Sequence, residues 1–141
     1  MTKVLVTGSS GQVGTNLSLA LQKENFTVLG VDKRSNTWTD QIPTLIRDLG
    51  KEGMPTTDEM AAELKDFDRP DLVVHLAANA KVHELVKNPS RAHENTTITF
   101  NVLEFCRRYQ VPIVFSSSRE VYGRPEPPNV SEDTTDVFHI L

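Results

Sequence analysis

Cysteine is almost absent from this sequence, and long apolar runs are missing. The single cysteine among 141 residues, Cys106, excludes a disulfide within the chain and is typical of a reducing cytoplasm. No apolar run approaches the roughly 20 residues that a membrane-spanning helix needs. The first residues lead directly into a predicted strand, so we expect no signal peptide. The sequence therefore predicts a cytoplasmic protein without a membrane segment.

Clustered positive charge and clustered metal ligands are also lacking. The formal net charge is −4, whereas binding to nucleic acid needs gathered lysine and arginine side chains. A basic pair, Arg107-Arg108, ends a predicted helix, where its charge complements the helix dipole. We therefore expect no nucleic-acid partner. We also expect no metal, because the histidines lack the spacing of a shared site; they are His75, His83, His93 and His139.

The sequence does contain a regular alternation of apolar strands and amphipathic helices. Strands are predicted at residues 3–7, 27–31, 44–49, 72–78 and 112–118. Helices are predicted at 11–25, 56–67, 81–88 and 90–109. Buried strands that alternate with helices are typical of a parallel sheet covered on both faces. The predicted fold class is therefore α/β, a Rossmann-type doubly wound sheet.

Local signals add detail to three of these helices. Thr56-x-x-Glu59 is a capping box at the start of the second helix, and Ser90 is expected to cap the long helix. The first helix is expected to turn four apolar side chains inward, namely Val13, Leu17, Ala20 and Leu21.

A glycine-rich turn, TGSSGQVG at residues 7–14, joins the first strand to the first helix. Gly8 permits the tight turn, Gly11 lets the backbone approach a pyrophosphate, and Gly14 lets the helix pack on the sheet. The helix then directs its free N–H groups at the phosphates. The alternative is a glycine turn without a ligand, but the strand before it and the helix after it favour a nucleotide.

Asp32 follows the second predicted strand, where an acidic side chain accepts hydrogen bonds from an adenosine ribose. A carboxylate there repels a 2′-phosphate, so NAD is favoured over NADP. Lys33 and Arg34 instead favour NADP, because a basic residue can accommodate that phosphate. The alternative interpretation of Asp32 is a loop residue that caps a turn.

The spacing Gly8-x-x-Gly11-x-x-Gly14 resembles that of the extended short-chain dehydrogenase/reductases, the NAD-dependent sugar epimerase/dehydratase group. Further matches are Asp32, Asp48-Leu49, His75-Leu76-Ala77-Ala78, Asn88-Pro89 with Asn95, and Ser116-Ser117-Ser118 with Val121-Tyr122-Gly123. The resemblance implies NAD as cofactor, a nucleotide sugar as substrate, and hydride transfer to and from a sugar hydroxyl carbon.

The resemblance also implies a role for each matching residue. The pyrophosphate would be held by Gly8, Gly11, Gln12, Val13 and Gly14, and the ribose by Asp32. The adenine would lie between Asp48 and Leu49, and the nicotinamide half beside Leu76, Ala77 and Ala78. Asn95 would stabilise the loop after the fourth strand, Ser116 would contact the cofactor, and Ser118 would be the active-site hydroxyl.

Several of these residues also have a purely structural interpretation. The Ala77-Ala78 pair allows close helix packing, and Asn95 is an ordinary polar residue for a solvated helix face. The serine run, residues 116–118, can satisfy backbone groups at a strand end.

The catalytic tyrosine of the family, as the resemblance implies, has its pKa lowered by a lysine four positions later. Neither tyrosine here has that lysine, because Glu126 follows Tyr122 and Ile113 follows Tyr109 at this offset. We therefore expect residues 1–123 to be the NAD(P)-binding Rossmann domain of a longer enzyme. Residues 124–141 would be an irregular, proline-rich and acidic tail that leads to the missing catalytic helix and substrate lobe, so the fragment would be inactive.

Glu120 bears on the type of reaction. The segment Ser118-Arg119-Glu120 resembles the acidic segment of the family's dehydratases, in which two acidic residues serve as acid and base. Glu120 matches that pattern, but Arg119 cannot protonate a leaving hydroxyl. An epimerase is therefore favoured over a dehydratase, and Glu120 as a solvated turn residue remains the alternative.

Two other classes of function are open. One is a non-catalytic NAD sensor, which the missing Tyr-x-x-x-Lys pair favours and the serine run disfavours. The other is an interaction module, because the resemblance implies a dimer through helix 90–109 and the helix after it. Without that second helix, we do not expect these 141 residues to form the family dimer.

Overall fold

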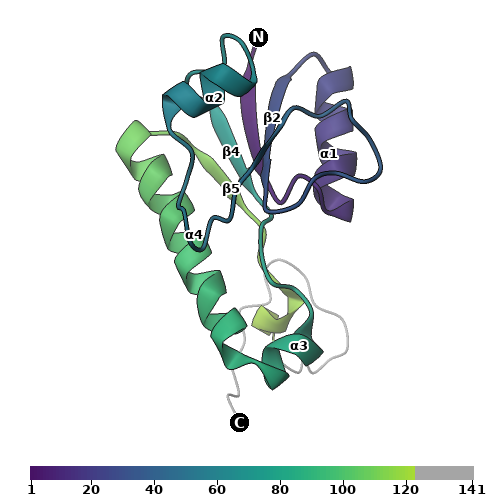
Figure 1. Ribbon diagram of the computed structural model, residues 1–141, viewed down its shortest axis with the longest axis vertical. Helices are drawn as coiled ribbons and strands as arrows, with labels where there is room; N and C mark the ends of the chain where they lie inside the picture. The colour runs from purple at the N-terminus through teal and green to yellow at the C-terminus, as the bar shows by residue number, and fades with distance from the viewer. Residues whose placement is uncertain (123–141) are drawn as a thin grey trace.

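The computed structural model describes residues 1–122, except for the side chains at positions 119 and 120, and has a parallel sheet at its centre (Figure 1). The strands are β1 (Lys3–Thr7), β2 (Thr27–Asp32), β3 (Thr44–Ile46), β4 (Leu72–His75) and β5 (Ile113–Phe115). The helices are α1 (Gln12–Lys23), α2 (Thr57–Glu63), α3 (Val82–Lys87), α4 (Pro89–Tyr109) and the short 3₁₀ helix η1 (Arg119–Tyr122).

The five strands lie in the order β3-β2-β1-β4-β5, and every pair is parallel. The chain adds β2 and β3 on one side of β1 and then crosses to add β4 and β5 on the other. β1 and β4 are therefore neighbours whose following loops diverge, which creates a crevice at their carboxyl ends. The predicted doubly wound sheet is confirmed.

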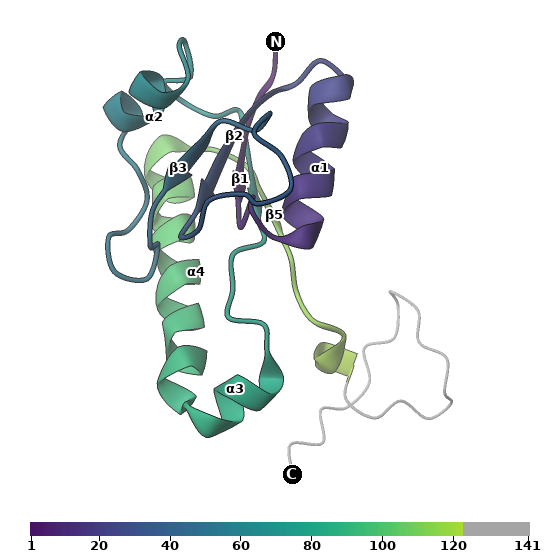
Figure 2. The same ribbon diagram turned by 45° about the vertical axis from the view of Figure 1, so that its right-hand side comes forward.

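Helices cover both faces of this sheet, with α1 on one side and α2 and α4 on the other (Figures 1 and 2). Because strand side chains alternate, Val4 and Val6 of β1 face α1 whereas Leu5 between them faces α2 and α4. The larger core lies on the α2 and α4 side and includes Phe67 and Val102. α3 and η1 lie beyond the carboxyl ends of the strands, next to the crevice side of the sheet (Figure 2).

The helix starts agree with the sequence signals at α2 and differ at α4. Thr56 Oγ1 accepts a hydrogen bond from Glu59 N, and Glu59 Oε2 accepts one from Thr56 N, so the capping box is present. The prediction of Ser90 as the cap of α4 is wrong, because the helix already begins at Pro89 with Asn88 as its N-cap. Proline suits the first helical position since it needs no N–H partner there.

Two predicted inward residues of α1, Val13 and Ala20, are exposed instead, and the exposed fraction of Val13 is 66%. The buried residues of α1 are small: Gly14, Thr15 and Ser18. Leu17 and Leu21 pack only partly against the strands. The helix therefore packs on the sheet through small buried residues, with Leu17 and Leu21 of the predicted stripe partly buried beside them.

The predictions for the last two strands are too long at their carboxyl ends, whereas those for β1 and β2 agree with the structure to within one residue. β4 ends at His75 rather than at residue 78, and β5 ends at Phe115 rather than at residue 118. β5 was also expected to be buried, but Val114 and Phe115 are 54% and 51% exposed, because β5 is the edge strand and pairs only with β4 among the described residues. Apolar residues past the strand ends line a crevice instead of extending the sheet.

Two phenylalanines distinguish the core from the surface. Phe67 is fully buried, whereas Phe100 on α4 is 63% exposed. Replacing Phe67 with alanine should lower the free energy of unfolding by about 3–5 kcal/mol, because the cavity left behind cannot fully collapse. Phe100→Ala removes the same atoms from the surface and should change it by less than about 1 kcal/mol. Urea denaturation measures both, and equal losses would contradict this description of the core.

Candidate functional site

A crevice of about 320 Å³ lies where the ends of β1, β2 and β4 meet. The glycine turn forms one wall and the loop after β4 forms the other. The predicted cofactor residues that line it are Gly8, Gly11, Gln12, Val13, Gly14, Asp32, Leu49, Leu76, Ala77 and Ala78. The structure thus gathers, around one crevice, residues that lie far apart in the sequence. Asp48, Asn95 and Ser116 were predicted with them and do not line this crevice.

The glycine turn is built by close backbone contacts. Gly8 has φ +74°, and a Cβ at this position would lie 2.9 Å from Ala77 N. A Cβ on Gly14 would lie 2.2 Å from the carbonyl oxygen of Gly8. Larger residues at these two positions would therefore push the turn away from the loop after β4 and from α1.

The N-terminus of α1 opens onto the same crevice. Gly11 is the N-cap of α1 and makes no side-chain capping bond. The first N–H groups of a helix have no partner within the helix, and they carry the positive end of the helix dipole. Gln12 and Val13 of this first turn line the crevice, so the exposed side of Val13 belongs to the candidate site.

Asp32 is held in a fixed orientation at the end of β2, with only 8% of its surface exposed. Its Oδ2 accepts a hydrogen bond from Ser10 N over 3.0 Å, and its Oδ1 accepts one from Arg34 N over 3.0 Å. A carboxylate has about four acceptor positions, so these two bonds leave capacity for a ligand hydroxyl. Ser10 belongs to the glycine turn, and this bond therefore also ties β2 to the turn.

The side chains of Leu49 and Asp48 have different surroundings, although the two residues are neighbours in the sequence. Leu49 is buried and lines the crevice. Asp48 folds back into its own turn, where its Oδ1 accepts a hydrogen bond from Gly50 N and its Oδ2 lies 3.8 Å from Lys51 Nζ. Asp48 therefore contributes to the shape of this end of the crevice through the turn that follows β3.

Arg47 also lines the crevice, and the sequence analysis did not identify it. Its guanidinium binds Glu59 Oε1 over 2.8 Å and two backbone carbonyls, so it is held against the start of α2. The bond to Thr56 N and the one to Arg47 together lower the pKa of Glu59. The signal available in the sequence was its position next to Asp48, but only the fold brings Arg47 to the crevice.

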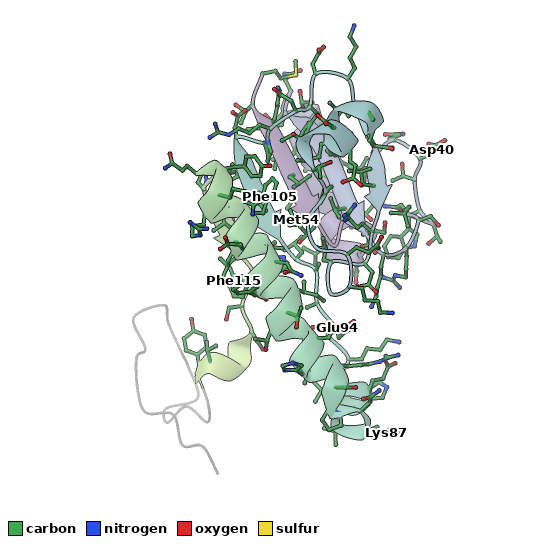
Figure 3. The ribbon with its side chains drawn as sticks, turned by 60° about the vertical axis from the view of Figure 1, so that its left-hand side comes forward. Asp40, Met54, Lys87, Glu94, Phe105 and Phe115 are labelled. Atoms are coloured by element: carbon green, nitrogen blue, oxygen red, sulfur yellow. The ribbon has the colours of Figure 1, made fainter. Side chains whose placement is uncertain are left out.

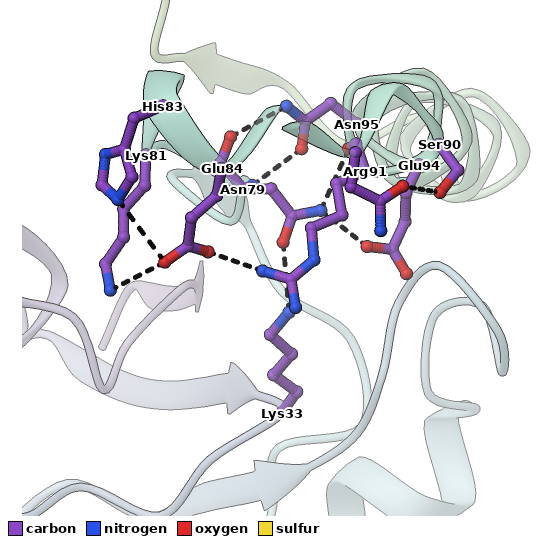
Figure 4. Close-up of polar contacts among 10 residues, drawn as sticks. Lys33, Asn79, Lys81, His83, Glu84, Ser90, Arg91, Glu94 and Asn95 are labelled. Carbon is purple, nitrogen blue, oxygen red and sulfur yellow. Dashed lines mark hydrogen bonds and ion pairs between the residues drawn. The ribbon is translucent and has the colours of Figure 1, made fainter. Parts of the chain in front are cut away.

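Asn95 anchors the loop after β4 by two hydrogen bonds (Figure 4). Its Oδ1 accepts a bond from Asn79 N over 2.7 Å, and its Nδ2 donates to Asn79 O over 3.1 Å. The Asn79 side chain donates to Glu94 Oε2 and accepts from Lys33 Nζ over 3.2 Å. This last bond joins the loop after β2 to the loop after β4.

A second pocket of about 520 Å³ continues along the loop after β4. It shares Leu76, Ala77, Ala78 and Ala80 with the crevice, so the two hollows meet along this loop. Its further walls come from β4, α4 and the end of β5, and include His75, Asn95, Thr99, Phe115 and the three serines 116–118. Asn95, Ser116 and Ser118 therefore belong to this pocket.

The predicted tail at residues 124–141 lies outside the described residues. The Glu120 side chain lies outside the described residues. The backbone of η1 follows the serine run, and Val121 N donates to Ser118 O over 3.1 Å.

Within residues 1–122, no group of three or more His, Cys, Asp or Glu side chains gathers in a way that could hold a metal. No helix in this part of the chain is long and apolar enough to cross a membrane.

A protein-family model matches most of the chain. The model of the NAD dependent epimerase/dehydratase family matches residues 4–139, which is nearly the whole sequence. Among curated proteins, the chain is 38% identical to UDP-glucuronate 4-epimerase 1 of Arabidopsis thaliana, over 94% of this chain and 34% of that protein. It is 34% identical to UDP-glucose 4-epimerase 3 of Oryza sativa subsp. japonica, over 93% of this chain and 38% of that protein.

Solved structures of similar proteins share the fold. The UDP-glucose 4-epimerase of Thermus thermophilus in complex with NAD matches with a TM-score of 0.75 and 28% identity, over 94% of this chain and 43% of that one. The UDP-glucose 4-epimerase of Bifidobacterium longum in complex with NAD+ and UDP matches with a TM-score of 0.76 and 26% identity, over 94% and 42%. The chain thus spans less than half the length of these proteins.

The packing of Gly14 generates a prediction about stability. Gly14→Ala should lower the free energy of unfolding by about 1–3 kcal/mol, because its Cβ would lie 2.2 Å from a backbone oxygen that has little room to move. Gly11→Ala is the matched control, since its Cβ would meet the same oxygen at 3.2 Å and needs a much smaller shift. Urea denaturation of both variants gives the comparison, and an equal loss would contradict the close approach at Gly14.

Proposed function

Because the chain belongs to the NAD dependent epimerase/dehydratase family, we propose that it is the NAD-binding portion of a nucleotide-sugar epimerase or dehydratase. When bound, NAD would supply hydride transfer to and from a sugar hydroxyl carbon. The residues of this chain bind the cofactor, orient it and line the space beside its reactive end. The chain covers only part of the length of its relatives, so the complete reaction belongs to a longer protein.

One observation carries this proposal. A buried carboxylate, Asp32, and the N-terminus of α1 lie on the same crevice at the switch point of the sheet. A dinucleotide has a diphosphate next to a ribose with two hydroxyls. The helix N-terminus attracts the diphosphate, and the carboxylate accepts hydrogen bonds from the hydroxyls. Each group of the protein thus has a matching group in the ligand.

The choice between NAD and NADP depends on charge near the ribose. The carboxylate of Asp32 repels a 2′-phosphate at close range. Arg34 Nε lies 4.0 Å from Asp32 Oδ1, but the Arg34 side chain is largely exposed and its charge is screened by solvent. Lys33 Nζ is already bound to Asn79 Oδ1. The balance favours NAD.

We place the reactive half of the cofactor and the sugar in the second pocket. Ala77 and Ala78 have small side chains and leave room beside the loop after β4. Ser116 and Ser118 lie on the opposite wall, at the end of β5. We assign Ser118 as the hydroxyl that hydrogen-bonds the reacting oxygen of the sugar, and Ser116 as a contact of the cofactor. Asn95 acts through the loop, which it holds in place.

Proton transfer needs a further group. A tyrosine with a neighbouring lysine can take the hydroxyl proton, because the ammonium lowers the pKa of the phenol. The residue four positions after Tyr122 is Glu126, whose negative charge acts in the opposite direction. We therefore propose that these 141 residues bind cofactor without turning over substrate.

A non-catalytic NAD sensor is the second candidate, and the same absence of Tyr-x-x-x-Lys from the 141 residues favours it. The two functions differ in the use of the second pocket. An enzyme fragment would still place part of the sugar against this pocket, although the substrate lobe is absent from the 141 residues, whereas a sensor needs only NAD. Binding of UDP-glucose by the NAD-loaded chain would favour the enzyme fragment.

The proposed role of Asp32 can be tested by cofactor preference. Asp32→Ala should weaken NAD binding by tenfold or more, since about 1.4 kcal/mol of lost hydrogen bonding corresponds to one factor of ten. NADP binding should change less or improve, because a repulsive charge is removed. Isothermal titration calorimetry measures both dissociation constants.

Asp40→Ala is the control for this experiment. Asp40 lies on a peripheral loop away from α4 (Figure 3), and the substitution makes the same change in net charge. Asp32→Asn serves as a second variant that preserves the side-chain shape. An equal loss of affinity for NAD and NADP in the Asp32 variants would overturn the assignment.

The absence of turnover gives a second test. The 141-residue protein, mixed with NAD and UDP-glucose or UDP-glucuronate, should produce neither NADH absorbance at 340 nm nor the epimeric sugar. Chromatography of the sugar nucleotides detects epimerisation even when the cofactor is recycled. A steady rate of epimer formation above the protein-free control would show that a proton-transfer group is present in this chain.

A further inference from the structure

His75 lines the second pocket, next to the loop that this pocket shares with the crevice, and the proposed binding function gives it no role. It ends β4, pairs in register with Thr7 of β1, and is 2% exposed. Its Nδ1 lies 2.7 Å from Thr7 Oγ1, and its ring packs against Phe115 with 5.7 Å between ring centroids. Its carbonyl oxygen accepts a bond from Ser116 N. The residue therefore contacts both neighbouring strands.

The other hydrogen bonds of the Thr7 hydroxyl indicate whether it donates to His75 or accepts from it. Leu76 N and Ala77 N both donate to Thr7 Oγ1, over 3.2 and 3.3 Å, and Leu76 N shares its proton with Thr7 O. A hydroxyl has two lone pairs and one proton. The two amides occupy the lone pairs, so the proton points to His75. Thr7 Oγ1 is therefore the donor and His75 Nδ1 the acceptor.

The protonation of the imidazole follows from this bond. With Nδ1 as acceptor, neutral His75 carries its proton on Nε2, which lies 3.4 Å from Thr99 Oγ1 on α4. Burial lowers the pKa of His75, which favours the same neutral form. The pocket wall formed by β4, β5, α3, α4 and the loop after β4 presents no other titratable side chain toward this pocket among the described residues. No charge among these residues therefore opposes the effect of burial on the pKa of His75.

The two amides that Thr7 holds belong to a wall of the crevice. Leu76 and Ala77 line it, and the backbone of Ala77 is the group that a Cβ on Gly8 would meet. The Thr7 hydroxyl, together with the Thr7 carbonyl oxygen that accepts from Leu76 N, therefore helps to hold the loop after β4 beside the glycine turn. We propose that His75 is a positioning residue for the cofactor, which orients the Thr7 hydroxyl so that it holds the Leu76 and Ala77 amides beside the glycine turn.

Protonation of His75 would disrupt this arrangement. An imidazolium has a proton on both nitrogens, so Nδ1 can no longer accept from Thr7. The Thr7 hydroxyl would have to turn and give up part of its hold on the two amides. Since the pKa is lowered below its ordinary value of 6.5, the neutral arrangement is complete above that pH and is lost as the pH falls below it.

The first experiment needs no cofactor. Nitrogen NMR of the 141-residue protein should find His75 neutral with its proton on Nε2. Amide exchange of Leu76 and Ala77 should accelerate about tenfold or more in His75→Leu and in Thr7→Val, because a polar partner is removed from a buried bond. His75→Asn keeps an acceptor near the Nδ1 position and should restore protection relative to His75→Leu.

Controls separate this effect from general destabilisation. His93→Leu makes the same substitution at an exposed position of α4 and should leave these two amides protected. If His75→Leu does not fold, His75→Gln replaces it, because its amide reaches the Nε2 position and leaves Thr7 without an acceptor. A proton on Nδ1 in the unaltered protein, or unchanged exchange of both amides in the His75→Leu or His75→Gln variant, would overturn the proposal.

The second experiment rests on the proposed binding of NAD and tests the link to it. The dissociation constant for NAD should be constant from pH 8 to about 6.5 and rise as the pH falls to 5. His75→Asn cannot titrate and should show a flatter profile. Equal profiles in the two proteins would refute the role of His75 while NAD binding stands. No NAD binding at any pH would refute the proposed function instead, and the exchange data would still decide the hydrogen bonding of His75.

Discussion

The close approach of two backbones at the ends of β1 and β4 is the constraint on which the rest of the site depends. Gly8 and Ala77 lie so near one another that a single Cβ on Gly8 would collide with the facing loop. Gly14 brings α1 equally close to the turn. Small residues at these positions let a helix N-terminus, a strand end and a loop meet around one crevice. Polar groups from three separate parts of the chain can then act on one ligand.

Under the proposed function, the site divides into a half that binds the cofactor and a half that lies beside the reacting sugar. In the binding half, the orientation of Asp32 is set by two backbone N–H groups, so its carboxylate is ready before a ligand arrives. In the other half, the serines at the end of β5 border a wide pocket next to an exposed edge strand. The loop after β4 separates the halves, and Asn95 and Thr7 hold it from opposite sides. The position of this loop therefore affects both halves of the site.

Local signals in the sequence predicted the features that depend on local interactions. The capping box of α2 needs only residues 56–59, and the glycine turn needs only the strand before it and the helix after it. The predictions failed where distant parts of the chain decide the outcome. Val13 and Ala20 were predicted to share the inward apolar face of α1 with Leu17 and Leu21, yet both are exposed. The fully buried residues of the helix are small. Apolar residues after β4 were read as strand, although they turn away to line the crevice.

The sequence by itself determined the alternation of strands and helices, the parallel sheet and the turn at residues 7–14, because periodicity and glycine placement act over short distances. Only the tertiary structure decided that Arg47 lines the crevice and that Asp48 turns back on itself. It also brought the Thr7 hydroxyl within reach of His75 and of two amides nearly seventy positions further along the chain, from which we infer the direction of the bond to His75. Hydrogen-bond direction is a property of the complete set of neighbours, and no local pattern contains that set.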